Sequence, residues 1–440
     1  MKTRWLKVRQ ALKREKADAL LVWNHEGSGQ PATEWLSRFT GTSSVLLISR
    51  KTTTPNPFLQ KLYTFRIRRR TLKVLRSSTY SLLTLEKRGG ISCLLITDSR
   101  YTSQAKREAK GFEVIILKQH ESAISVLKRL VIKLGLRRIL IDGAVSSYSA
   151  IEDIKKEVPT VKIISKKHLL QELRIVKDKE EIAILRKAAG IASRAFLRLL
   201  PEVKAGVTER SLAARLEALC REEGAEGMSF DTMVASGANS AFPHSKPSDK
   251  KLKGGELVLI DWGVLYKGYV SDMTRTVALG RISPRLRKIY ETVRKAQELA
   301  CDKAKAGIGG RALDAICRNY LDKKGLGKYF TYATGHGIGM EIHEMPVVSP
   351  RSNHPQPLLT EAVHLSHPKA DTQGLAKLHV FASHLRKGGE EKLPTGAVIT
   401  CEPGVHIPSV GGVRIEDTLV LTKNGNINLS AGVTKELLIL

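Results

Sequence analysis

The stretch LVLIDWGVLYKGYVSDMTRTVALG, residues 257–280, decides how the second half of the chain folds. Val, Ile, Leu, Tyr and Thr dominate both of its arms, and Lys267-Gly268 between them suits a two-residue turn. The stretch therefore predicts a β-hairpin in which Tyr266 pairs with Tyr269.

Each arm of this hairpin carries an aspartate among apolar neighbours. The predicted pairing sets Asp261 opposite Thr274 and Gly263 opposite Asp272. Because side chains alternate faces along a strand, both aspartates then lie on one face, with backbones roughly 7 Å apart. Two half-buried carboxylates this close repel each other unless a proton or a cation lies between them. Two alternatives follow: a metal site, or aspartates that cap the turn or face water.

The net charge of +30 would by itself suit a polyanionic partner. The charge is uneven, because residues 51–89 hold ten Lys or Arg against one Glu. Elsewhere basic residues alternate with acidic ones, as in RLRKIYETVRKAQELACDKAKAG, which is typical of solvated helix faces. Nucleic acid is therefore not expected as the main partner.

With 440 residues, 42% of them hydrophobic, the chain is long enough for two globular domains. No stretch reaches the roughly 18 apolar residues of a spanning helix, and the charged N-terminal stretch lacks the apolar core of a signal peptide. The five cysteines have no CxxC spacing, which favours buried, reduced thiols. A cytoplasmic protein without membrane contact is expected.

Residues 1–170 alternate apolar strands such as ADALLVW and RILIDG with helical patterns such as SAISVLKRLVIKLG, which predicts an α/β domain. Residues 171–440 are expected to form a second domain, whose first helix begins at Asp178 with Glu181 in capping-box spacing. Further helices are expected over Thr208 to Gly224 and over about Pro284 to Lys305. Helices and antiparallel strand pairs in this order predict an α+β domain.

Further polar residues stand in apolar runs of the second domain. YATGHGIGMEIHEMPVV contains His336 and His343, TCEPGV contains Glu402, and GGVRIEDTLVL contains Glu416. Each alone is more often a hydrogen-bonded core residue than a ligand. Together with the hairpin aspartates they form a donor set rich in oxygen, which suits a pair of divalent ions such as Mn²⁺, Co²⁺ or Zn²⁺ bridged by carboxylates.

These residues and their order resemble the metal-dependent pita-bread peptidases of family M24, most closely the Xaa-Pro branch with prolidase and aminopeptidase P. Five motifs carry the resemblance, which covers nearly the whole chain: GAEGMSFDTMVASGANSAFPH, LIDWGVLYKGYVSDMTRT, GHGIGMEIHE, CEPGVHIP and GGVRIEDT. The resemblance implies an α+β pita-bread (creatinase/aminopeptidase-like) catalytic domain over residues 171–440. A creatinase-like α/β domain over residues 1–170 would precede it.

The resemblance also implies a metal site. Two divalent ions would be bound, with Mn²⁺ expected first and Co²⁺ or Zn²⁺ as alternatives. Their ligands would be Asp261, Asp272, His336, Glu402 and Glu416. The ions would activate a water that hydrolyses the Xaa-Pro bond of dipeptides or of peptide N-termini.

Other roles follow from matching positions in the family. Glu402 is the expected proton acceptor. His244 and His343 are expected to bind substrate and to stabilise the tetrahedral intermediate. A proline-containing peptide is the expected substrate, and a homodimer is the expected assembly.

Two residues beside the ligands have expected supporting roles. Arg414 stands two residues before Glu416, which would place both on one strand face, and it is expected to pair with a substrate carboxylate or to orient the metal carboxylates. Thr274 is expected to support Asp272.

Two segments exceed the family's pattern and are expected as insertions, residues 51–89 and about Ser352 to Gly389. The sequence leaves open whether they impair activity. It also leaves open whether the chain is a dipeptidase or an aminopeptidase. Two other functions suit the same fold: a non-catalytic peptide- or nucleic-acid-binding protein, and a metal-free creatinase-like hydrolase. Either would be expected to lack some of the five ligands, and none is missing.

Overall fold

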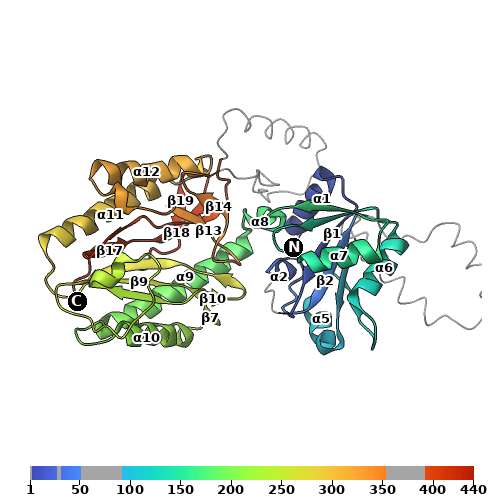
Figure 1. Ribbon diagram of the computed structural model, residues 1–440, viewed down its shortest axis with the longest axis horizontal. Helices are drawn as coiled ribbons and strands as arrows, with labels where there is room; N and C mark the ends of the chain where they lie inside the picture. The colour runs from blue at the N-terminus through green and yellow to red at the C-terminus, as the bar shows by residue number, and fades with distance from the viewer. Residues whose placement is uncertain (1, 27–30, 51–91, 353–391) are drawn as a thin grey trace, which may run out of the picture. The chain divides into compact units, whose positions relative to one another are not determined.

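The computed structural model describes residues 2–26, 31–50, 92–352 and 392–440. The predicted insertions at 51–89 and about 352–389 lie outside the described residues, apart from Ser352. The chain divides into two compact units, Met1–Leu173 and Arg174–Leu440, coloured from blue to green and from green to red in Figure 1.

In the N-terminal unit, the described strands form one mixed sheet in the order β4-β3-β2-β1-β5-β6. The strands are β1 Ala19–Asn24, β2 Ser44–Ser49, β3 Ser92–Thr97, β4 Glu113–Ile116, β5 Arg138–Asp142 and β6 Lys162–Lys166. The helices are α1 Lys2–Arg14, α2 Pro31–Ser37, α5 Thr102–Glu108, α6 Ala123–Leu134, α7 Tyr148–Glu157 and α8 Leu169–Arg174. β1, β2 and β3 pair antiparallel, whereas β4, β5 and β6 each join a neighbour in parallel.

The central strands of this sheet are continuous apolar runs because helices cover the sheet. α6 and α7 pack their apolar faces, including Leu127 and Ile154, on strand residues such as Leu47 and Ile139. The α6 backbone begins at the capping Ser122 and ends at a left-handed glycine, as its sequence predicts. The predicted α/β alternation is confirmed.

The C-terminal unit contains the helices α9 Lys179–Leu199, α10 Glu209–Glu222, α11 Pro284–Lys303 and α12 Gly310–Lys323. Its strands are β7 Gly227–Met228, β8 Met233–Ser236, β9 Leu257–Trp262, β10 Val264–Tyr266, β11 Tyr269–Val270, β12 Met273–Ala278, β13 Gly335–Gly337, β14 Glu344–Val348, β15 Val398–Cys401, β16 Gly404–Ile407, β17 Gly411–Arg414, β18 Asp417–Leu421 and β19 Asn426–Asn428. They form short antiparallel sheets in the orders β12-β9-β8, β11-β10-β7, β14-β13-β15-β18-β19 and β16-β17.

Two helix layers enclose these strands (Figure 1). α9 and α10 pack on the β8–β9–β12 side, while α11 and α12 pack on the β15–β18 side, so each layer has its own apolar core. α9 begins with the predicted capping box, in which Asp178 accepts from the backbone N–H of Glu181 and Glu181 accepts from that of Asp178. α12 was not expected. Among the described helices, none has both the length and the apolar character that a bilayer-spanning segment requires.

Candidate metal centre

The predicted hairpin forms with the predicted register. Tyr266 pairs with Tyr269 across Lys267 and Gly268, which both have positive φ (48° and 72°), and Asp261 pairs with Thr274. Such a turn matches the twist of the two arms.

The ladder is interrupted beside Asp272. A Cβ on Gly263 would lie 1.9 Å from the Ser271 carbonyl oxygen, so only glycine permits the close approach of the two arms at this point. Asp272 then lies in the gap between β11 and β12, and Asp261 lies within β9.

The remaining predicted ligands come from the other side of the unit. His336 lies in β13, whereas Glu402 lies between β15 and β16 and Glu416 between β17 and β18. The expectation that all the acids stand within strands is therefore wrong for three of them, Asp272, Glu402 and Glu416. At these positions the strand ends locally, and the backbone can turn an acid inward without a cross-strand partner.

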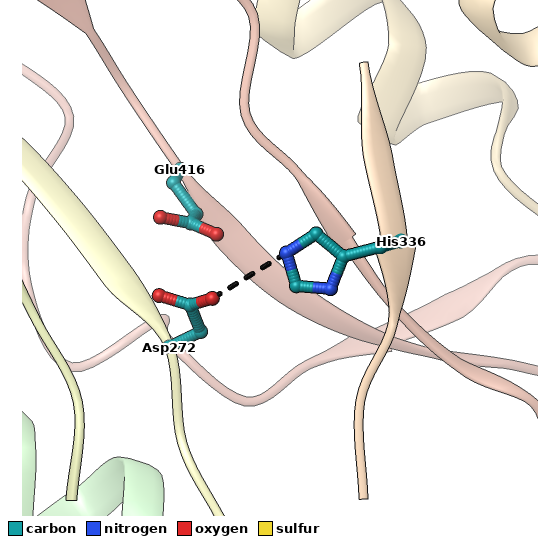
Figure 2. A group of neighbouring side chains, drawn as sticks. All are labelled: Asp272, His336 and Glu416. Carbon is teal, nitrogen blue, oxygen red and sulfur yellow. Dashed lines mark ion pairs between the residues drawn. The ribbon is translucent and has the colours of Figure 1, made fainter. Parts of the chain in front are cut away.

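The five residues line one cavity, and three of them converge closely. One ligand atom from each of Asp272, His336 and Glu416 lies within 4.8 Å of the others, and Figure 2 shows the three side chains converging from three different segments of the chain. His336 Nε2 is 3.5 Å from Asp272 Oδ2 and 3.2 Å from Glu402 Oε1. A cavity of about 320 Å³ is lined by all five predicted ligands and by the other predicted site residues His244, His343 and Arg414.

Burial makes this set of acids electrostatically unfavourable without a cation. It raises the pKa of Asp272 and of Glu416 well above the ordinary values, and the neighbouring carboxylates raise both further. Burial also raises the pKa of Asp261, although Arg414 opposes this. For Glu402 the effect of burial is outweighed by the hydrogen bond from His336, which lowers its pKa.

The donor atoms fit a divalent cation. His336 Nδ1 lies 3.0 Å from the Gly337 carbonyl oxygen, and because that oxygen can only accept, Nδ1 carries the proton. Nε2 is then the nitrogen that faces the carboxylates. Although burial opposes the charge, the hydrogen bond from Nε2 to Glu402 raises the pKa of His336 in the metal-free protein. A divalent cation would take the place of the Nε2 proton and accept the lone pair. Asp261 Oδ1 and Glu416 Oε1 are buried and accept no hydrogen bond from any described residue. Carboxylates with one imidazole suit Mn²⁺, Co²⁺ or Zn²⁺.

Arg414 faces the same acids and is almost fully enclosed. Its Nη2 donates to Asp261, its Nε donates to Thr274 Oγ1 at 3.1 Å, and its Nη1 donates to the Pro243 carbonyl at 3.2 Å. Although burial opposes the charge, Asp261 raises the pKa of Arg414. Of the two roles considered for Arg414, these contacts match the orientation of a metal carboxylate.

Two details of the prediction are wrong. Arg414 ends β17, and Glu416 lies after that strand, so the two residues do not share one strand even though both line the cavity. Thr274 Oγ1 donates to Glu416 Oε2 at 2.7 Å and thus supports Glu416 rather than Asp272. Asp272 is held instead through its backbone carbonyl, which accepts from Thr418 Oγ1 at 3.0 Å.

His244 and His343 are exposed and lie on the wall of the cavity. The His343 ring packs edge-to-face on His336, with centroids 4.4 Å apart. Partial burial and the neighbouring His336 lower the pKa of His343, so its imidazole is neutral near pH 7. A neutral imidazole on the wall can donate a hydrogen bond to an oxygen in the cavity.

Several residues of the cavity were not predicted individually. They come from two short segments and one loop: Phe230, Asp231, Thr232, Met233, Ser245, Lys246, Pro247 and Ile342. The motif GAEGMSFDTMVASGANSAFPH contains four of these eight residues, Phe230 to Met233, but no spacing within it shows which side chains point inward. His406 is not among the lining residues; it is buried, its Nδ1 lies 2.9 Å from the Ser240 carbonyl oxygen, and its Nε2 has no partner among the described residues.

Comparisons with known proteins agree with this architecture. The family model described as "Metallopeptidase family M24" matches residues 183–423, and that of the "Creatinase/Prolidase N-terminal domain" matches residues 76–176. The uncharacterized peptidase YqhT of Bacillus subtilis is 40% identical over 357 residues, which cover 80% of this chain and 88% of the relative.

Two solved structures are similar over almost their full lengths. A Xaa-Pro dipeptidase from Bacillus anthracis has a TM-score of 0.78 and 32% identity, covering 99% of each chain. An X-Pro aminopeptidase from Thermotoga maritima has a TM-score of 0.75 and 33% identity, covering 98% of this chain and 100% of the other. The predicted fold class, a creatinase-like α/β domain followed by an α+β pita-bread domain, is thereby confirmed. The chain belongs to metallopeptidase family M24.

Proposed function

We propose that this protein hydrolyses the Xaa-Pro bond of dipeptides or peptide N-termini with the help of two divalent ions, Mn²⁺ first among them. The observation that carries the proposal is a single cavity that joins four carboxylates, two of them fully buried, to Nε2 of His336. The names of similar proteins support the specificity, since both solved relatives named above are described as acting on X-Pro substrates.

The ion ligands would be Asp261, Asp272, His336, Glu402 and Glu416. Bound divalent ions polarise a substrate carbonyl and lower the pKa of water. They would also neutralise the repulsion that raises the pKa of Asp272 and Glu416.

The chain's own residues divide the remaining work. Glu402, whose pKa His336 holds below its usual value, is ionised near pH 7 and can accept the proton of an attacking water. His244 and His343 can donate hydrogen bonds to the carbonyl oxygen as negative charge develops on it. Arg414 fixes the orientation of Asp261.

The proposed preference for proline has a physical reason. Its tertiary amide has no N–H to donate, so a site that accepts it binds by shape and through the carbonyl oxygen. The donors of Arg414 are engaged by Asp261, Thr274 and Pro243, which leaves the exposed histidines and Lys246 to meet a substrate carboxylate.

The test combines metal analysis with a substrate panel. We expect two divalent ions per chain after reconstitution with Mn²⁺, loss of activity on chelation, and faster hydrolysis of Ala-Pro than of Ala-Ala. Comparing Ala-Pro with Ala-Pro-Ala decides between dipeptidase and aminopeptidase. Equal rates on Ala-Ala and Ala-Pro would reject the Xaa-Pro assignment, and a metal-free, active protein would favour the creatinase-like alternative.

A protein that binds metal but cleaves neither peptide would favour the binding-protein alternative. The homodimer and the cytoplasmic location stay predictions, which gel filtration and cell fractionation can check.

A further inference from the structure

A second cluster of charges lies beside the cavity, within the C-terminal unit. Lys177 Nζ donates to Glu344 Oε1 at 2.6 Å, and Arg174 Nη2 contacts both Glu341 and Glu344. The side chains of Arg174, Lys177 and Glu344 are at most 2% exposed. Two buried cations thus meet two carboxylates, and none of the residues belongs to the proposed metal site.

This ion cluster holds one end of the loop that joins β13 to β14, residues 338–343. Glu344, its main acceptor, is the first residue of β14 and directly follows His343 in the chain. A Cβ on Gly339 would lie 2.4 Å from Glu344 Oε1 and 3.0 Å from Lys177 Cε, so the loop backbone packs directly on the ion pair.

The other contacts of the loop fix its first half. Ile338 donates its N–H to the Val398 carbonyl at 3.1 Å, and the Gly339 carbonyl accepts from the Val270 N–H at 2.9 Å. The backbone of Lys177 is itself held in place, because its backbone N–H donates to the Gly396 carbonyl at 2.9 Å. The second half of the loop, which carries His343, is therefore anchored by the ion cluster, through Glu341 on Arg174 and through Glu344 on Lys177 and Arg174.

The place of the His343 ring depends on that backbone. Its ring packs edge-to-face on His336, but it forms no hydrogen bond with any described residue that would hold it in place. A ring fixed by one ring contact and by its own backbone follows any movement of the loop.

We propose that Lys177 and Glu344 are positioning residues for His343: their buried ion pair sets the loop so that the imidazole faces the carbonyl oxygen of the substrate. The inference rests on the proposed function, because it assigns His343 the role of hydrogen-bond donor. Removing Glu344 leaves Lys177 buried without this counter-charge, and removing Lys177 leaves Glu344 with only the longer contact to Arg174 at 3.4 Å. In either case the backbone must shift to admit water or another counter-charge. A displacement of about 1 Å can lower a rate about 100-fold.

The experiment uses Lys177→Met and Glu344→Gln in the full-length protein, with Lys179→Met as the matched control. Lys179 is exposed, stands two residues from Lys177 and belongs to neither site. For each variant kcat and KM on Ala-Pro, bound metal, melting temperature and amide hydrogen exchange over residues 338–344 are measured. We expect kcat to fall about 10- to 100-fold with KM changed less than about 3-fold, bound metal unchanged and exchange faster in the loop, while the control matches the wild type.

Combining Lys177→Met with His343→Ala shows whether the ion pair acts through His343. If it does, Lys177→Met should lower kcat little or not at all when His343→Ala is already present. An equal loss in both backgrounds, or a wild-type kcat with lower stability only, would overturn the proposal. If Lys177→Met does not fold, Glu344→Gln gives the same comparison.

Failure of the proposed function gives a different result. In that case the wild type itself leaves Ala-Pro intact, while the exchange measurement still tests the anchoring of the loop. Unchanged exchange over residues 338–344 in both variants would overturn the inference whatever the activity.

Discussion

Glu416 and Asp417 are neighbours in the chain, both are buried, and their surroundings differ completely. Asp417 accepts from Arg275 at 2.8 Å, from Gln297 at 3.0 Å and from Asn428 at 2.9 Å, and Lys435 lies 3.2 Å away. Glu416 faces other carboxylates, and its Oε1 has no partner among the described residues.

The pKa values of the two acids move in opposite directions. Burial acts to raise both, but Arg275 and Lys435 outweigh it and lower the pKa of Asp417. At Glu416, Glu402 and Asp261 add to the effect of burial and raise the pKa well above its usual value. Burial alone therefore does not mark a functional acid. The informative difference is that the protein supplies the counter-charge of Asp417, whereas the proposed metal ion would supply that of Glu416.

The largest effect is expected for Glu402→Gln, which changes another acid of the proposed metal site. The amide keeps the size of the side chain and one carbonyl oxygen, but it cannot accept the proton of water. We expect turnover to fall by about 10² to 10⁴ while the fold survives. Turnover and bound metal are measured together. Near-normal turnover with metal bound would remove Glu402 from the mechanism. A variant that is inactive and binds no metal would show that Glu402 is a ligand, without testing its role as a base.

Asp417→Asn should damage stability instead of chemistry. Without the carboxylate, Arg275 stays buried without its counter-charge, which costs about 3–5 kcal/mol of the free energy of unfolding. Urea denaturation of the metal-free protein measures the loss. A wild-type stability would mean that Asp417 is not the structural counterpart of Glu416.

His406 extends the comparison to a buried base. Burial, with smaller contributions from Arg414 and His244, lowers its pKa from 6.5 to about 4, although the hydrogen bond with the Ser240 carbonyl opposes this. The depressed value means that stability is present in full above pH 6.5 and is lost as the pH falls from 6.5 towards 4, by about 2–3 kcal/mol. We expect His406→Gln to flatten this part of the stability profile of the metal-free protein, and parallel profiles for the two proteins would contradict the assignment.

The smallest expected effect has the opposite sign. In metal-free protein near pH 7, Glu416→Gln removes a buried charge that repels its neighbours, so the free energy of unfolding should rise by about 1–3 kcal/mol. The same change should weaken metal binding, which isothermal titration with Mn²⁺ can follow. Destabilisation of the metal-free protein would show that Glu416 is satisfied like Asp417.

The sequence predicted what is local and missed what depends on distant contacts. The hairpin register follows from Lys267, Gly268 and the alternation of the arms, all within a few residues of each other. Thr274 was assigned to Asp272, two residues away, whereas its partner Glu416 is 142 residues away. No local pattern contains that contact.

The strand interruptions were missed for the same reason. Glu402 lies outside the ladders because its N–H donates to the Thr334 carbonyl of another segment. The roles of His244 and His343 were accessible only through family resemblance, since exposed histidines in loops carry no periodic signal. The ion pair of Lys177 with Glu344 had no signal either, because it joins residues 167 positions apart.

The wide spacing of the proposed ligands also has a consequence for synthesis. Asp261 and Asp272 share one hairpin, which can form in microseconds, but Glu416 follows Asp272 by 144 positions. At roughly 5–20 residues per second, the ribosome needs about 7–30 s to add it. During that interval the chain adds first His336 and then Glu402 to the two aspartates, so an ion meets an incomplete site until Glu416 is made. The full set of proposed ligands can select its metal only after that.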